Sequence, residues 1–126
     1  MEKHFIENTK KHTTTCIITD HPTVTDKLIK KNAVFAGLVS THDCRRTYAN
    51  KFVGVTRCHK LDTPDSGIGR NIASSKADLA YHKAMARDLK DIKQQVIKEF
   101  ATLKALEAHE LKMIDKTSAF LKLLKQ

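Results

Sequence analysis

The stretch 53–77 reads VGVTRCHKLDTPDSGIGRNIASSKA, and it joins two hydrophobic patterns of different period. Its first residues alternate around apolar side chains, as expected for a strand. Asp65 and Ser66 are favourable helix N-cap residues, and from Ile68 onward apolar residues recur at helical spacing. The stretch therefore predicts a strand that leads through a turn into a helix, which begins at about Ser66.

Two further strands are predicted upstream of this stretch. Residues 13–19 read TTTCIIT, a run dense in β-branched side chains that is closed by a proline. Residues 33–40 form a continuous apolar run of strand length, and the third strand covers 48–58, so that 41–47 becomes a hairpin loop. Together the three strands predict a small antiparallel sheet.

The remaining upstream segments carry a weaker signal. Residues 1–12 are polar, so we expect them to fray or to become ordered only on a partner. Residues 20–32 are charged and rich in Thr, and a short helical turn or a loop fits 26–32.

The second half of the chain is predicted to be helical, because good helix formers dominate the 57 residues after Gly69 and neither Gly nor Pro occurs there. A single helix of that length would extend about 85 Å, against a radius of gyration of about 14 Å for a compact domain. We therefore expect either a break near 108–110 or at 115–118, which gives two long helices, or an unbroken helix covered by a partner chain. An apolar stripe follows one helix face: Leu89, Ile92, Val96, Phe100, Leu103, Leu111, Ile114 and Leu121.

These patterns predict an α+β fold class, with a small N-terminal antiparallel sheet of about three strands followed by two long C-terminal helices. A chain of 126 residues fits one domain, with a β-sheet part over 1–66 and a helical part over 67–126. The stripe predicts a homodimer or a higher homo-oligomer that forms through the C-terminal helices.

The charge balance favours anionic partners. Lys and Arg number 23 against 14 Asp and Glu, which gives a formal net charge of +9. Phosphates, nucleic acid or an acidic protein are therefore the expected partner classes. The chain has no Trp and only 6% aromatic residues, which argues against a surface that stacks successive bases of a single strand.

The sequence indicates neither a membrane partner nor a cofactor. It has no run of 18 consecutive apolar residues and no apolar signal-peptide core after Met1, so we expect a cytoplasmic protein. A mixed metal set is conceivable from His42, Cys44, Cys58 and His59 by residue type, but cysteines that act as small buried hydrophobes are the favoured interpretation, and no metal is expected.

Catalysis is not expected either. His59, Asp62 and Ser66 supply a base, an orienting acid and a nucleophile by type, yet no nucleophile-elbow motif accompanies them. A nucleotide phosphoesterase is the weaker enzymatic alternative.

The junction between strand and helix is the candidate binding site. The first N–H groups of a helix and the positive end of its dipole suit a phosphate, and basic residues surround this junction. We expect the guanidinium groups of Arg57 and Arg70 to converge on one phosphate, and the full ligand-binding set is Arg57, His59, Arg70, Asn71 and Lys76. The Gly-x-Gly at 67–69 is not a dinucleotide fingerprint, because the third Gly and a βαβ unit are missing.

The same stretch carries a family resemblance, through Val53-Gly54-Val55, Arg57-Cys58-His59, Asp62, Pro64-Asp65, Gly69, Ile72-Ala73 and Lys76-Ala77. This pattern resembles one found in small phage and bacterial proteins. The arrangement of a basic β-sheet half followed by two long helices is similar to the phage anti-Thoeris sponge proteins, which sequester cyclic ADP-ribose-type immune signals without cleaving them. A related small phage protein that shares the strand-to-helix motif is the alternative. The resemblance implies a phage-encoded anti-defence protein that traps a small phosphate-bearing nucleotide, cyclic ADP-ribose-type or a cyclic oligonucleotide, in the cytoplasm of an infected bacterium. It also implies assembly as dimers or multiples of dimers.

A basic protein that binds nucleic acid, or that inhibits a host enzyme, is the alternative function. Five lysines at Lys83, Lys90, Lys93, Lys98 and Lys104 are spaced along the predicted helix and would follow a phosphate backbone.

Overall fold

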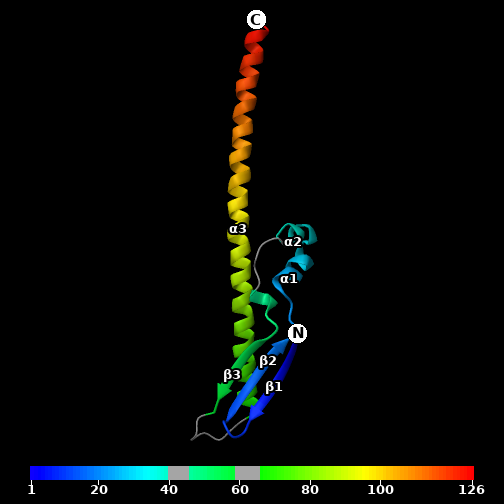
Figure 1. Ribbon diagram of the computed structural model, residues 1–126, viewed down its shortest axis with the longest axis vertical. Helices are drawn as coiled ribbons and strands as arrows, with labels where there is room; N and C mark the ends of the chain where they lie inside the picture. Colours follow the sequence, from blue (N-terminus) through cyan, green and yellow to red (C-terminus); the bar gives the residue numbers. More distant parts are fainter. Residues whose placement is uncertain (40–45, 59–65) are drawn as a thin grey trace. The chain divides into compact units, whose positions relative to one another are not determined.

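The structure, a computed structural model, describes residues 1–39, 46–58 and 66–126 (Figure 1). The elements run β1 (Glu2–Asn8), β2 (Thr13–Thr19), α1 (Val24–Lys31), α2 (Ala33–Val39), a 3-10 helix η1 (Arg46–Tyr48), β3 (Phe52–Arg57) and α3 (Ser66–Leu124). The chain divides into two units, Met1–Ile92 and Lys93–Gln126. All the buried residues of the described chain belong to the first unit.

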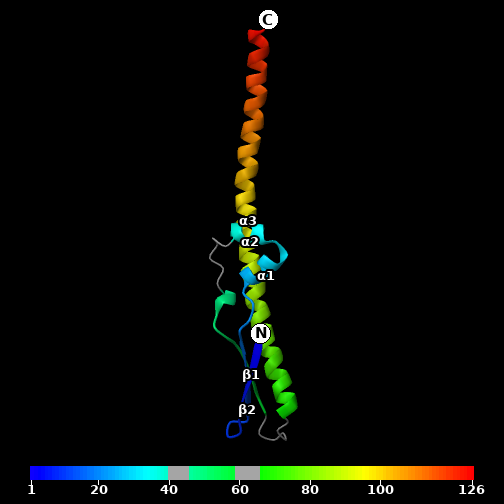
Figure 2. The ribbon, with the colours of Figure 1, turned by 90° about the vertical axis from the view of Figure 1, so that its right-hand side faces the viewer.

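The three strands form one antiparallel sheet in the order β1-β2-β3. Phe5 pairs with Cys16, and Cys16 pairs with Gly54 in the next strand. Side chains alternate between the two faces of a sheet, so these three residues share one face. The first part of α3, residues 66–92, lies along that face (Figure 2). Val53 and Val55 are exposed on the opposite face.

Gly54 makes a close contact between the sheet and α3. A Cβ atom at this position would lie 2.2 Å from the carbonyl oxygen of Ala73 and 2.4 Å from the amide nitrogen of Ala77. Ala73 and Ala77 are completely buried and lie one helical turn apart. Because Ala73 and Ala77 have small side chains and Gly54 has none, the backbones of α3 and β3 are in direct contact.

The N-terminal strand is tied to α3 by polar contacts. Lys3 Nζ donates to Ser74 Oγ at 2.8 Å and forms an ion pair with Asp78 at 3.0 Å. At the other end of β1, Arg70 Nε donates to Glu7 Oε1 at 2.9 Å. These contacts explain why a polar segment is ordered as a strand. The expectation that 1–12 frays is therefore wrong.

The second helix, α2, occupies a run that the sequence analysis assigned to a strand. Asn32 Oδ1 accepts the Phe35 amide at 3.0 Å and so caps this helix. The strand prediction for 33–40 is wrong, because a short continuous apolar run fits a buried strand and a helix equally well. The expected hairpin loop at 41–47 lies outside the described residues except for its last two positions.

The sequence left a short helical turn or a loop open for 26–32, and the structure has a helix there that is longer than one turn. It is α1, which begins after Thr23. The Thr23 hydroxyl accepts the Asp26 amide at 3.2 Å, and the Asp26 carboxylate accepts the Thr23 amide at 2.9 Å. This reciprocal capping box fixes the start of the helix.

The α+β class and the three-stranded antiparallel N-terminal sheet are confirmed. The strands predicted at 13–19 and within 48–58 are present. The third strand of the sheet is β1 and not 33–40. The helical second half is confirmed as one continuous helix, α3, with no break at 108–110 or 115–118. Within the described ranges, no helix combines the length and apolarity that a membrane span needs.

Gly54→Ala tests the contact between β3 and α3. Because the added methyl group would overlap the α3 backbone, we expect the free energy of unfolding to fall by about 3 kcal/mol, as measured by urea denaturation. Gly37→Ala is the matched control, since nothing lies within 4 Å of its added Cβ and Ala is the better helix former by up to about 1 kcal/mol. A Gly54→Ala protein as stable as the wild type would contradict the close contact.

Candidate functional site

The two arginines predicted to converge on one phosphate lie apart. Arg57 ends β3, and strand alternation places it on the face opposite Gly54, away from α3. The Arg70 guanidinium is bonded to Glu7 and lies over the Phe5 ring, with 5.3 Å between Cζ and the ring centroid. Arg70 is therefore held against β1 on the helix-covered face. The expected two-arginine grip is not formed.

The other predicted ligand residues are scattered along the same region. Lys76 Nζ donates to the Val55 carbonyl at 3.0 Å, so its ammonium group is bonded to the backbone of β3. Asn71 is exposed on α3. His59 lies outside the described residues. Neither Asn71 nor Lys76 forms a hydrogen bond or an ion pair with Arg57 or Arg70.

The residues that carry the family resemblance have a packing role. Gly54, Ala73 and Ala77 form the contact between β3 and α3, and a Cβ at Gly69 would lie 2.9 Å from the Thr14 hydroxyl oxygen. The small residues of 53–77 are therefore explained by close approach of a strand and a helix. This explanation requires no ligand.

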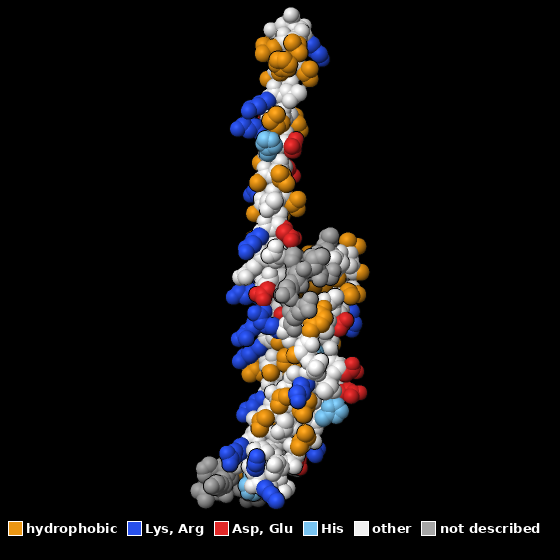
Figure 3. Space-filling model, viewed as in Figure 1, with side chains coloured by type: hydrophobic (Ala, Val, Ile, Leu, Met, Phe, Trp, Pro, Cys, Tyr) orange, Lys and Arg blue, Asp and Glu red, His pale blue; other side chains and the backbone are white. Residues whose placement is uncertain are grey.

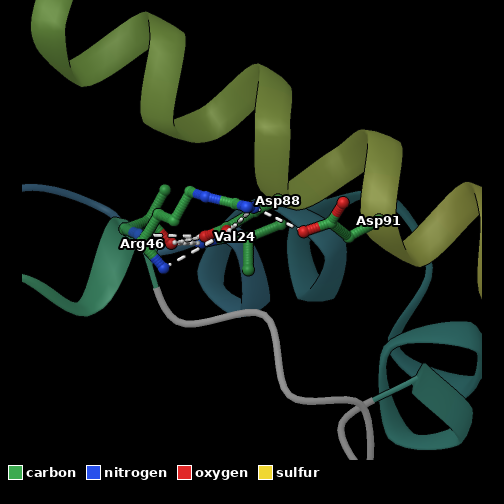
Figure 4. Close-up of polar contacts among 5 residues, drawn as sticks. Val24, Arg46, Asp88 and Asp91 are labelled. Atoms are coloured by element: carbon green, nitrogen blue, oxygen red, sulfur yellow. Dashed lines mark hydrogen bonds and ion pairs between the residues drawn. The ribbon is translucent and has the colours of Figure 1, made fainter.

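The sequence analysis missed a buried carboxylate, Asp88, which is completely inaccessible to solvent. Its two oxygens accept the amides of Arg46 at 3.2 Å and of Thr47 at 2.9 Å, and the Thr47 hydroxyl at 2.9 Å. That hydroxyl in turn accepts the Val24 amide at 2.9 Å. The Arg46 guanidinium lies 3.7 Å from Asp88 and also pairs with Asp91 (Figure 4).

This network joins three elements that are distant in sequence: α1, η1 and α3. Buried carboxylates are costly unless they are hydrogen-bonded or paired, and Asp88 is both. An available sequence signal was an acidic residue placed between Met85 and Ile92 on the buried side of the helix. The arrangement indicates a structural carboxylate rather than an acid or base for catalysis.

An aromatic cluster lies next to this network. The His21 ring is edge-on to Phe52 and to Tyr81, with ring centroids 4.8 Å and 5.5 Å away. His21 Nε2 donates to the Thr47 carbonyl at 2.9 Å, and the Tyr81 hydroxyl donates to the Pro22 carbonyl at 2.8 Å. Burial, with a smaller contribution from the Asp26 charge, raises the pKa of the Tyr81 phenol.

The cysteines that the structure describes follow the packing interpretation in part. Cys16 is buried in β2, and burial raises the pKa of its thiol. Cys58 is only half-buried. Among the described residues, no group of three His, Cys, Asp or Glu is placed to hold a metal ion. Three members of the metal set considered by residue type lie outside the described residues: His42, Cys44 and His59.

A basic face runs along the outer side of α3. Lys83, Arg87 and Lys90 are exposed, and none of the three forms an ion pair with a described residue. Their spacing of four and three residues puts them on one side of the helix, opposite the buried Tyr81 and Met85. Lys and Arg side chains line this edge of α3, at the left of Figure 3. We call these three residues the basic face.

Comparison with protein-family models, with curated proteins and with solved structures gave no significant match.

Asp88→Ala tests the buried network. The substitution leaves the amides of Arg46 and Thr47 without their acceptor, so we expect a loss of about 2–4 kcal/mol in the free energy of unfolding, measured by thermal and urea denaturation. Asp91→Ala removes the exposed partner of Arg46 and should cost no more than about 1 kcal/mol. Equal losses in the two variants would show that Asp88 is not the joining group.

Proposed function

We propose that this protein is a non-catalytic binding protein that assembles with further copies of itself and holds a phosphate-bearing ligand on the basic face of α3. The observation that carries the ligand class is the set of three exposed cations, Lys83, Arg87 and Lys90, none of which forms an ion pair with an acidic residue of the described ranges. The net charge of +9 adds a long-range attraction for anions.

Two ligand classes fit this proposal, and different observations support them. The resemblance of 53–77 supports a small signalling nucleotide as the ligand. Proteins of the kind it resembles act in the cytoplasm of an infected bacterium. Because Arg57 and Arg70 lie apart, their guanidinium groups are not placed to bind one phosphate of such a nucleotide together. Nucleic acid is supported by the basic face, which spans about 10 Å of helix at 1.5 Å per residue. That length covers several phosphates of a duplex backbone.

The polar groups of the first unit support the non-catalytic part of the proposal, because they are hydrogen-bonded within the fold. Asp88 is occupied by backbone and hydroxyl donors, and Tyr81 and His21 each bond a backbone carbonyl. These groups join elements of the fold. A phosphoesterase reaction would require a nucleophile and a base within reach of one substrate atom.

Alanine substitution of the basic face distinguishes nucleic acid from a small nucleotide as the ligand. With labelled duplex DNA and RNA, we expect Lys83→Ala, Arg87→Ala and Lys90→Ala combined to weaken binding. The slope of log affinity against log salt should become shallower by about 0.9 for each lost phosphate contact. Fluorescence anisotropy at several salt concentrations measures both quantities. Calorimetry with cyclic oligonucleotides and cyclic ADP-ribose isomers tests the small-nucleotide class on the same samples.

The control removes the same charge elsewhere, through Lys30→Ala, Lys31→Ala and Lys51→Ala, all at exposed positions. An equal loss in both triple variants would reduce the effect to net charge and overturn the basic face as the site. Calorimetric binding of a small nucleotide without any nucleic-acid binding would assign the trap function. No binding in either assay would overturn the proposal for the ligand.

Self-association is supported by segment 93–126. From residue 97 onward every residue is exposed, and eleven large apolar side chains are 41–68% accessible: Ile97, Phe100, Leu103, Leu106, Leu111, Met113, Ile114, Phe120, Leu121, Leu123 and Leu124. Helices in water gain most of their stability from packing an apolar face. Exposed apolar surface of this extent is typical of an interaction site.

Sedimentation of the full chain tests this assembly. We expect a mass of two or more chains, and a shift to one chain in the double variant Leu103→Glu and Leu106→Glu, because two charges would be buried in the interface. Association should weaken about 100-fold or more. Ala101→Glu with Ala105→Glu adds the same charge on the opposite helix side and should keep the wild-type mass. A wild-type chain that sediments as a monomer would contradict the assembly.

A further inference from the structure

Strand β1 forms one edge of the three-stranded sheet, and within the described ranges no other strand pairs with its outer side (Figure 1). Six of its seven residues are exposed, and Phe5 is half-buried. An edge strand presents backbone N–H and C=O groups that a further strand can bind. The outer side of β1 is therefore a possible interaction surface, and its backbone and charges decide which strand fits it.

The hydrogen bonds between β2 and β3 show which backbone groups of β2 face each neighbour. The Cys58 amide donates to the His12 carbonyl at 2.8 Å, directly beyond the pair of Thr13 and Arg57. In an antiparallel sheet, hydrogen-bonded pairs alternate with pairs that are not hydrogen-bonded. The even-numbered residues of β2 therefore bond to β3, and the odd-numbered residues of β2 bond to β1.

The same alternation determines which backbone groups of β1 face outward. Thr13 of β2 is opposite Asn8 of β1, so the even-numbered residues of β1 bond to β2. The N–H and C=O groups of Lys3, Phe5 and Glu7 consequently point away from the sheet. Among the described residues, no loop or cap hydrogen bond reaches these groups.

The opposite edge of the sheet, β3, is partly closed. Its odd-numbered residues face outward by the same alternation, and the outward carbonyl of Val55 already accepts Lys76 Nζ at 3.0 Å. A strand that added to β3 would have to displace this lysine. The edge at β1 is therefore the more accessible of the two.

The side chains of Lys3 and Glu7 make the β1 edge selective. Both lie on the face that α3 covers, where Lys3 pairs with Asp78 and Glu7 pairs with Arg70. Charges that point inward on an edge strand oppose the addition of an unrelated strand. A strand that fits this edge should carry an acidic residue opposite Lys3 and a basic residue opposite Glu7.

A second copy of β1 meets this requirement in one register. Antiparallel pairing through the outward groups joins odd-numbered residues to odd-numbered residues. With the two-fold axis at Phe5, Lys3 of each copy faces Glu7 of the other, and all seven residues of the strand are paired. Opposite charges and aromatic pairs between directly opposed residues stabilise neighbouring strands. The charges then alternate across the contact in the order Asp78, Lys3, and Glu7 and Arg70 of the second copy.

The other registers that use the outward groups lose these features. An axis at His4 or at Ile6 pairs only five of the seven residues. It also places Phe5 of the other copy opposite Lys3 or Glu7. An axis at Lys3 or at Glu7 sets like charges directly opposite each other, which is destabilising. Length of pairing and charge therefore favour the same register.

We infer that β1 pairs edge to edge with β1 of a second copy of this chain, in antiparallel orientation and centred on Phe5. The contact uses only the first unit, so it is independent of the self-association proposed for segment 93–126. Seven residues a side are fewer than the about 20–30 of a stable interface. The edge contact therefore adds to that assembly, and by itself it is too weak to hold two chains together during sedimentation.

Disulfide trapping in the full chain tests this contact and its register. His4 and Ile6 are exposed on the sheet face opposite α3, and the inferred pairing places them directly opposite each other. Chains with His4→Cys and chains with Ile6→Cys are mixed and mildly oxidised, and the linked cysteines are identified by peptide mass. We expect at least about tenfold more 4–6 link than 4–4 or 6–6 link, because a disulfide needs Cα atoms within about 7 Å.

Val55→Cys is the matched control, because Val55 is exposed on the same sheet face but belongs to the other edge strand. Mixed with either variant, it should give only a background level of links. The same 4–6 preference is expected in chains that also carry Leu103→Glu and Leu106→Glu, since the contact does not involve segment 93–126.

The links that form separate the possible failures. Mostly 4–4 links would move the axis to His4, mostly 6–6 links would move it to Ile6, and either result would overturn the register. A 4–6 link no more frequent than random pairing gives would overturn the edge contact itself. A wild-type chain that sediments as a monomer, yet prefers the 4–6 link, would overturn only the assembly through 93–126.

Discussion

The close approach of β3 to α3 at Gly54 is the constraint on which the first unit depends. Because the missing side chain lets the strand lie directly on the backbone at Ala73 and Ala77, the sheet face of Cys16 and Ile18 comes within reach of the helix. The edge strand β1 is also bonded to α3, through Lys3 of the strand and Arg70 of the helix. Any larger residue at position 54 separates the layers, and the buried contacts along the whole sheet are weakened with it.

The same packing decides which charged groups are available for binding. Arg70 is bonded to Glu7 and Lys76 to the Val55 carbonyl, so two of the predicted ligand residues act within the fold. Asp88 and Arg46 are likewise occupied in joining η1 to α3. The cations of the basic face are left exposed because the opposite side of α3 covers the sheet. For this reason we propose the basic face, and not Arg70 or Lys76, as the surface that binds an anion.

The patterns of 13–19, 52–57 and 66–124 were readable because each has a clear period or a long run of helix formers. Residues 33–39 were misassigned because an apolar run of this length has no period that separates strand from helix, and its Asn32 cap is a local detail. The strand at Glu2–Asn8 was missed because its stability comes from β2, Ser74 and Asp78, which lie far along the chain. Asp88 was missed for the same reason, since its donors come from η1.

The sequence alone determined the α+β class, the position at which the long helix begins and the apolar stripe along that helix. These properties depend on residue type and local spacing, which short-range physics translates directly into secondary structure. Only the tertiary structure decided that Arg57 and Arg70 lie on opposite faces of the sheet, and that Asp88 is a buried joining group. Those outcomes depend on strand register and on which side of the sheet the helix covers. Both are determined by contacts between residues that are far apart in the chain.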